Sequence, residues 1–435
     1  MVESYSGSSA QEAIKAAKTI EAAFRSNAPL ARKLVEKIRG LAIEAERRLG
    51  DASRFKIMDF CGTHEWTITH FGIRSLMPEQ IELVAGPGCP VCVTPSLFVE
   101  EAIRLALDGI HVYTYGDVYR LMSIRSVRGA SSLSEARALG GRVKVVHSLL
   151  DAALDARSHG RDSVFVGIGF ETVAPGYAHA VIRGLLPPNL KLMSLVKLTP
   201  PAMFHSIEIL REKPTEPPIV GVIAPGHVST ITGAKAWVPV AENYGIPVVV
   251  SGFEPLDVLA SIAEILKQLS RGEARVAIEY ARAVTWHGDL RAQSIVGRAF
   301  ETVDDAWRGI GFLPKSGLRL RSAFSKYDAF ETYGVKEVTP ENWSYDLLPG
   351  CRCAEVVIGK AKPTDCPLFM KRCTPSKPYG PCMVSLEGAC AIWARFGSGG
   401  LADEIARELG ISPSAQPGST SGVGDFMGEQ APRGG

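Results

Sequence analysis

Short apolar segments alternate with amphipathic segments along most of the chain. Eight segments are rich in valine and isoleucine and end in glycine, proline or polar residues, the pattern of buried strands; they lie at residues 55–60, 81–86, 110–116, 143–148, 163–170, 190–196, 219–226 and 246–253. Helical patterns lie between them, for example at residues 96–108, 149–160 and 256–272. Because apolar strands that alternate with helices form parallel sheets covered on both faces, the pattern predicts an α/β fold.

The eight strands allow two architectures. They can close into one barrel or form two open, doubly wound sheets. The tripeptide Gly-Phe-Glu follows two of the strands, at residues 169–171 and 252–254. This repeat hints at a duplicated unit and favours two similar sheets, although the pattern alone leaves the choice open.

The two ends of the chain show other patterns. Alanine, leucine and alternating charges up to residue 50 predict a helical N-terminal extension over residues 1–50. We place one α/β domain at 51–155 and a second at 156–325. Residues 326–400 are rich in proline, glycine and cysteine and predict a small cysteine-rich domain. Residues 401–435 predict a short helix and a disordered tail.

The composition excludes some classes of function. The chain has 435 residues, 46% of them hydrophobic, and a formal net charge of +2. A charge this small argues against nucleic-acid binding driven by a positive field. The first residues lack the apolar core of a secretory signal, and no apolar run is long enough to span a membrane. We therefore expect a cytoplasmic protein without nucleic-acid or membrane partners.

The nine cysteines fall into two groups. Three lie near the N-terminus and six between residues 351 and 390, with none in between. In the reducing cytoplasm, clustered cysteines are more often metal ligands or redox groups than structural disulfides. The distribution predicts two separate sites of sulfur chemistry.

The N-terminal cysteines follow two strands directly. Cys61, in the motif CGTH, comes after the first strand, and Cys89 and Cys92, in GPGCPVC, come after the second. The carboxyl ends of strands form the edge at which α/β sheets bind ligands. If the strands are neighbours, Cys61 approaches the Cys-x-x-Cys pair. This pair can close a reversible disulfide, clamp a soft metal, or simply be buried. His64 can act as a ligand, a proton donor or a structural cap.

Further polar groups end other strands. Asp117, Glu171 and His227 follow the third, fifth and seventh strands. Each position also suits a turn or a helix cap. Because all three end strands at the same edge as the thiols, we expect them to line one cleft with Cys61.

The C-terminal cysteines have the spacing of a metal centre. Cys353, Cys366, Cys373 and Cys390 are separated by 12, 6 and 16 residues. Four thiolates suit tetrahedral zinc or a [4Fe–4S] cluster, and the wide gaps with a proline after Cys366 favour iron–sulfur. Cys351 and Cys382 are spare.

Together these motifs resemble the HypD family of hydrogenase maturation proteins. The resemblance covers roughly residues 50–400 and rests on CGTH, GPGCPVC, GFET at 169–172, PGHVS at 225–229 and the terminal CRC…EGAC run. It departs at Val173, where the family usually has a second threonine, and in the loop that follows residues 116–120.

The resemblance implies a function, a cofactor and partners. The family assembles the Fe(CN)2CO group of [NiFe]-hydrogenases with a HypC-type chaperone, and HypE delivers cyanide made with HypF. Iron would be held between a chaperone cysteine and Cys61. Cys89 and Cys92 would bind iron or cycle as a dithiol. The resemblance also implies a [4Fe–4S] cluster on the four spaced cysteines, and two similar α/β units plus a cluster domain in place of a barrel.

The mechanism that follows is electron-assisted assembly of an iron site. Soft thiolates suit iron that carries cyanide and CO. His64, Glu171 and His227 would move protons or position the diatomic ligands. Two rival interpretations are a general iron–sulfur thiol oxidoreductase and a zinc-stabilised binding scaffold without redox chemistry.

Overall fold

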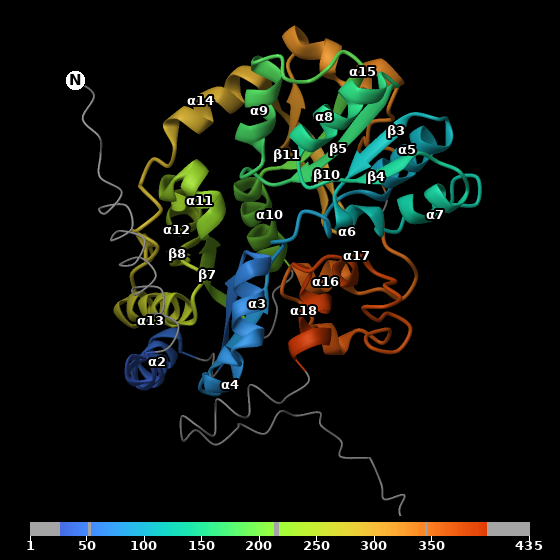
Figure 1. Cartoon of the computed structure of the whole chain (residues 1–435). Helices are drawn as coiled ribbons and strands as arrows, with labels where there is room; N and C mark the ends of the chain where they lie inside the picture. The colour runs from blue at the N-terminus through green and yellow to red at the C-terminus, as the bar shows by residue number, and fades with distance from the viewer. Residues whose placement is uncertain (1–26, 51–53, 213–216, 344–345, 398–435) are drawn as a thin grey trace, which may run out of the picture.

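The computed structural model describes residues 27–50, 54–212, 217–343 and 346–397 (Figure 1). It contains two sheets. The first sheet has five parallel strands in the order β2 (Ile81–Ala85), β1 (Phe55–Asp59), β7 (Ile219–Pro225), β8 (Val248–Ser251) and β9 (Val276–Ile278). The second has six, in the order β10 (Phe300–Trp307), β11 (Gly311–Leu320), β6 (Leu190–Lys197), β5 (Ser163–Gly169), β3 (His111–Thr114) and β4 (Val143–Val145).

The second sheet is parallel from β3 to β6, and β11 runs antiparallel to both β6 and β10. The α-helices of the described residues are α2 (Ala28–Leu49), α3 (Gly62–His70), α4 (Ile73–Leu76), α5 (Ser96–Leu107), α6 (Gly116–Tyr119), α7 (Leu133–Ala138), α8 (Leu149–His159), α9 (Ala174–Ile182), α10 (Thr199–Glu212), α11 (Gly226–Thr232), α12 (Val238–Tyr244), α13 (Pro255–Arg271), α14 (Leu290–Ala299), α15 (Ala329–Tyr333), α16 (Cys353–Val357), α17 (Pro381–Val384) and α18 (Ala389–Phe396). Short 3-10 helices are η1 (Ala234–Trp237), η2 (Ser322–Tyr327) and η3 (Pro363–Asp365).

All eight predicted strands are present, as β1 to β8. They are the apolar strands of the parallel sheets, and β5 is buried at every position. The sequence pattern did not indicate β9, β10 and β11. Strand β10 lies at the edge of its sheet, so several of its positions are exposed and polar. Strand β11 contains Pro314 and charged residues, so neither strand has a continuous apolar run.

The two sheets share one strand order. Numbered along the chain, the first four strands of each sheet lie in the order second, first, third, fourth: β2-β1-β7-β8 and β4-β3-β5-β6. The Gly-Phe-Glu repeat does not mark this similarity. It follows the third strand of the second sheet, β5, but the fourth strand of the first sheet, β8.

The chain passes repeatedly between the sheets. Strands β1 and β2 belong to the first sheet, β3 to β6 to the second, β7 to β9 to the first, and β10 and β11 to the second. The predicted ranges 51–155 and 156–325 therefore do not correspond to the two sheets, because each range contributes strands to both. Each sheet is assembled from strands that are far apart in the sequence, so no change in amino-acid composition along the chain marks where one sheet ends and the other begins.

We call each sheet, with the helices that pack on it, a unit, so the first unit contains the first sheet and the second unit the second sheet. Helix α2 packs into the core of the first unit. Val35, Ile38 and Leu41 are buried in one core with α13 residues such as Leu259 and Ile262. This confirms the helix predicted before residue 50, whose earlier half lies outside the described residues, as does the predicted tail. Within the described ranges no helix is long and apolar enough to cross a membrane.

The cysteine-rich segment contacts both units. Figure 1 shows α16 to α18, in orange-red, beside α3. The Asp117 carboxylate at the start of α6 accepts hydrogen bonds from the Ser385 hydroxyl (2.9 Å) and the Leu386 amide (3.2 Å). The segment after α17 is thus anchored to the second unit while α18 packs on the first.

Candidate metal and thiol site

A cleft lies where β1 and β2 end. It is lined by Asp59, Cys61, Gly62, Glu65, Ala85, Gly86, Gly88, Cys89, Cys92, Val357, Glu387 and Ala389. The strands are neighbours, as the sequence required for Cys61 to approach the Cys-x-x-Cys pair. Residues from the first sheet and from the cysteine-rich segment therefore share one cleft.

Glycines allow the two strand ends to meet. A Cβ atom on Gly88 would lie 2.5 Å from the Cα of Cys61, so no side chain fits there. The Gly88 carbonyl accepts a hydrogen bond from the Gly62 amide (3.1 Å), and the Gly86 amide donates to the Asp59 carbonyl (2.6 Å). The Gly-Pro-Gly sequence thus holds Cys61 against the following cysteines.

Cys89 and Cys92 form a disulfide in this structure. Both are buried, and the Cys92 amide donates to the Cys89 sulfur at 3.2 Å. Of the alternatives left open by the sequence, the structure contains the disulfide. In this oxidised state the two sulfurs are not thiolates, so their predicted role as iron ligands applies only to the reduced dithiol.

Cys61 is the free thiol of the cleft. It is half-buried and precedes the first turn of α3. Burial, with a smaller contribution from the Glu387 carboxylate, raises the pKa of its thiol to about 12. The group is therefore a neutral thiol near pH 7 until a cation binds beside it.

Three carboxyl groups line the cleft that sequence analysis did not single out: Asp59, Glu65 and Glu387. Burial and the Glu65 charge raise the pKa of Asp59 well above its ordinary value. Burial, and then the charge of Asp117, also raise the pKa of Glu387. The sequence signal that could have identified Asp59 as a site residue is an acidic side chain at the apolar end of the first predicted strand.

His64 and His227 lie together, outside the lining of this cleft. Both rings stack on Phe253, with centroids 4.8 and 3.9 Å from it. Nε2 of His64 donates to the Gly252 carbonyl at 2.9 Å. Burial lowers the pKa of His64 to about 4 and also lowers that of His227. Their sequence motifs are adjacent in the first sheet because β7 lies beside β1.

Glu171 belongs to the second sheet and lines a different cavity. Its buried carboxylate accepts hydrogen bonds from the Thr199 amide (2.6 Å) and hydroxyl (2.7 Å). Burial raises its pKa to about 7. The expectation that Glu171, His227 and Asp117 line one cleft with Cys61 is therefore wrong. Asp117 and Glu171 follow strands of the second sheet, and His227, although it follows β7 beside β1, stacks on Phe253 outside the cleft lining.

The C-terminal thiols gather around Cys353. Its side chain interacts with those of Cys351, Cys382 and Cys390. The interaction with Cys353 lowers the pKa of Cys351 to about 7. The two cysteines that the sequence left spare thus lie beside two of the predicted ligands.

The other two predicted ligands lie differently. Burial raises the pKa of Cys373, although its sulfur accepts hydrogen bonds from the Tyr379 and Gly380 amides at 3.3 and 3.4 Å that oppose this rise. A Cβ on Gly380 would be 2.8 Å from the Cys353 sulfur, so glycine is needed here. Cys366 lies nearer the surface, with its sulfur 3.9 Å from the Gly350 carbonyl oxygen. Thiol groups such as these are the ligands that a soft metal centre prefers.

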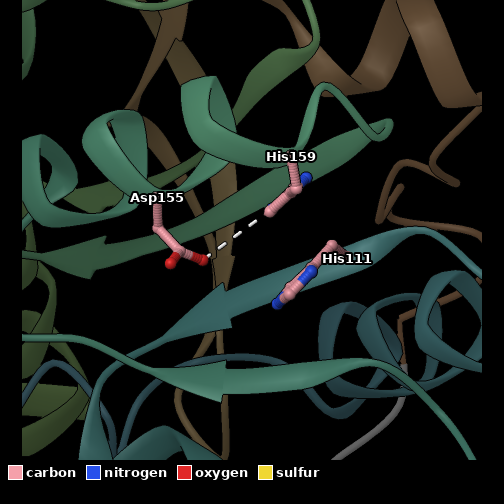
Figure 2. A group of neighbouring side chains, drawn as sticks. All are labelled: His111, Asp155 and His159. Carbon is pink, nitrogen blue, oxygen red and sulfur yellow. Dashed lines mark ion pairs between the residues drawn. The ribbon is translucent and has the colours of Figure 1, made fainter.

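A further histidine cluster lies in the second unit (Figure 2). Ligand atoms of His111, Asp155 and His159 lie within 4.8 Å of one another. The Arg161 amide donates to Nδ1 of His159 at 3.0 Å, so the neutral ring carries its proton on Nε2. This Nε2 lies 2.8 Å from the Tyr113 hydroxyl, which donates to Asp155. A protonated Nε2 has no lone pair for a metal, so His159 and Asp155 form a hydrogen-bonded chain through Tyr113, and the His111 ring stacks on Tyr113 and His159.

Comparison with known proteins identifies the family. The family model described as "HypD: Hydrogenase formation hypA family" matches residues 30–397. The chain belongs to the HypD family. It is 39% identical to hydrogenase maturation factor HypD of Cupriavidus necator, over 82% of this chain and 92% of that protein. The HypD proteins of Azotobacter vinelandii and Rhizobium leguminosarum bv. viciae are 39% and 40% identical, over 86% and 80% of this chain and 96% and 90% of their own lengths.

The match begins at residue 30, earlier than the resemblance estimated from motifs alone. It therefore includes most of α2, consistent with the packing of that helix. Val173, where the HypD motif usually has threonine, makes no side-chain capping bond to α9 and packs on Gly169. In the other departing loop, Val127 pairs with Ala130 through a tight turn.

Proposed function

We propose that this chain is a hydrogenase maturation factor, the scaffold on which the Fe(CN)2CO group of a [NiFe]-hydrogenase is assembled. The observation that supports this most is the free Cys61 thiol beside the Cys89–Cys92 disulfide in one cleft, in a member of the HypD family. The relatives' names give the general role in hydrogenase formation.

Cys61 would bind the iron that is assembled, which is a substrate rather than a resident metal. Cys61 is half-buried and lines the cleft, and a thiolate from a HypC-type chaperone would be the second ligand of the iron. The raised pKa of Cys61 keeps the proton on sulfur until iron arrives, and the charge of the cation then favours the thiolate. Glu387, whose pKa is also raised and which lines the same cleft, would accept that proton.

The disulfide would supply the redox step. Opening it takes two electrons and two protons and yields a dithiol able to bind iron. The Cys92 sulfur lies 3.9 Å from the Pro381 carbonyl, one residue before Cys382, so the pair contacts the cysteine-rich segment. A [4Fe–4S] cluster on Cys353, Cys366, Cys373 and Cys390 would, when bound, exchange single electrons.

The remaining predicted residues would act indirectly. His64 is neutral and tied to the Gly252 carbonyl, so it would orient α3 rather than move a proton at Cys61. Glu171 would hold the start of α10 through Thr199, and His227 would pack on Phe253, both outside the cleft lining. Cyanide would come from a HypE-type donor, the finished group would pass to the hydrogenase large subunit, and the reducing cytoplasm would be the place of assembly.

One rival function has a specific observation in its favour. The buried Cys89–Cys92 disulfide also suits a general thiol–disulfide oxidoreductase. Under that function Cys61 would be dispensable and no chaperone would be required. A zinc-stabilised scaffold would instead bind zinc in the cysteine-rich segment and show no redox chemistry.

The three functions are separated by one preparation. The protein is purified anaerobically after co-expression with HypC-, HypE- and HypF-type proteins. Maturation predicts iron, visible absorbance that bleaches on reduction, and cyanide and carbonyl infrared bands. Absorbance without these bands would favour the oxidoreductase, and stoichiometric zinc without visible absorbance would favour the scaffold.

A further inference from the structure

Glu65 is a buried carboxylate that no catalytic step above uses. It lies one turn after Cys61 in α3 and is only 1% exposed. A buried charge is costly unless it is paired and hydrogen-bonded, so its partners indicate what the residue does.

The Glu65 carboxylate joins three helices. Within α3, Oε1 accepts from the Thr69 hydroxyl (3.2 Å). From α4, the Arg74 guanidinium pairs with Oε2 at 2.5 Å. From α18, the Trp393 indole N–H donates to Oε1 at 2.5 Å. Arg74 also lies over the Trp393 ring, 4.8 Å from its centroid, which closes the group.

Helices α3 and α18 contact each other along their lengths. Near their starts, a Cβ on Gly62 would lie 2.5 Å from the Glu387 carbonyl oxygen. Near their ends, the His70 and Phe396 rings pack edge to face with centroids 4.8 Å apart. The helices therefore run side by side in the same direction. Cys61 precedes α3 and Cys390 lies in the first turn of α18, so both begin with a functional thiol.

We propose that Glu65 is a positioning residue that locks the Cys61 helix to the Cys390 helix. Through Trp393 and Arg74 it fixes the register of α18 on α3, and so the place of Glu387 and Cys390 relative to the Cys61 sulfur. The two sulfur sites then form one rigid body. The consequence for iron assembly rests on the function proposed above, whereas the mechanical lock does not.

The lock is tested by two substitutions with a matched control. Glu65→Gln keeps the shape but presents an NH2 group to a donor, and Trp393→Phe keeps an aromatic ring but is smaller and lacks the indole N–H. Glu101→Gln is the control, because Glu101 is also buried and paired with an arginine, Arg104, but lies in α5. The readout is the alkylation rate of Cys61 in the folded protein, followed by mass spectrometry, with circular dichroism to verify folding.

We expect Cys61 to be alkylated about tenfold faster in Glu65→Gln, the effect of losing a hydrogen bond to a charged group, and several-fold faster in Trp393→Phe. Glu101→Gln should match the wild type. If Glu65→Gln matches Glu101→Gln, the lock is refuted.

Infrared spectra of the co-expressed complexes provide the second readout. Cyanide bands that shift or weaken in Glu65→Gln and Trp393→Phe, but not in Glu101→Gln, support positioning. Unchanged bands in both variants refute a role at the iron site. If the wild type shows no bands, the proposed function fails, while the alkylation rates still decide the lock.

Discussion

Replacing Gly88 by alanine should displace Cys61. The added Cβ would lie 2.5, 2.6 and 2.8 Å from the Cα, N and C atoms of Cys61. These are backbone atoms that no rotamer change can move, so one strand end must shift. Overpacking of this kind costs about 1–3 kcal/mol.

Gly297→Ala is the matched control. Gly297 lies within α14, and nothing lies within 4 Å of the Cβ position. Alanine in a helix is favoured over glycine by about 0.5–1 kcal/mol, so this variant should be slightly more stable than the wild type. The same substitution therefore has opposite expected effects at the two positions.

The assay is denaturant unfolding of both variants, combined with the alkylation rate of Cys61. Gly88→Ala should lower the unfolding midpoint and change the alkylation rate, whereas Gly297→Ala should leave that rate unchanged. If Gly88→Ala is as stable as Gly297→Ala and alkylated at the wild-type rate, the close contact between the strand ends is not a constraint and the description of the cleft is wrong.

Three further predictions concern charges and thiols. The pKa of Glu171 in the folded state is raised from 4.5 to about 7, so its contribution to the free energy of unfolding is present below about pH 4.5 and is lost as the pH rises to 7, by up to about 3 kcal/mol. Glu171→Gln should therefore flatten the pH dependence of stability measured by denaturant unfolding. An unchanged slope in the variant would contradict this prediction. Lys197→Met should lower the free energy of unfolding by about 3–5 kcal/mol, because buried Asp305 loses the ammonium group that lies 2.6 Å from its carboxylate. Denaturant unfolding measures this change. A decrease below about 1 kcal/mol would argue against a buried ion pair. Since the pKa of Cys61 is raised from 9.0 to about 12, its alkylation rate should still rise about tenfold per pH unit beyond about pH 10, and a rate that levels off near about pH 10 would show an ordinary thiol.

The sequence predicted the parallel strands because burial on both faces leaves continuous apolar runs, as in β5 and β7. It also indicated that Cys61 would approach the Cys89 and Cys92 pair if the strands before the two motifs were neighbours, and β1 and β2 do pair. Local pattern was sufficient wherever the relevant residues were close in sequence.

Other features depend on contacts that no local pattern contains. PGHVS joins the first sheet only because the chain returns there after four strands of the second, which separates His227 from Glu171. Likewise, the partners of Glu65 lie 9 and 328 residues away. Edge strand β10 was missed because its exposed face carries polar residues.

Infrared spectroscopy of the Cys61→Ala variant tests the central claim most directly. The variant and a Cys351→Ala control, which removes a thiol outside the proposed ligand set, are each co-expressed with the HypC-, HypE- and HypF-type proteins and purified anaerobically. We predict cyanide and carbonyl bands in the wild type and in Cys351→Ala, and none in Cys61→Ala. Bands of wild-type position and intensity in Cys61→Ala would show that iron is assembled elsewhere and would contradict the proposed function of the cleft.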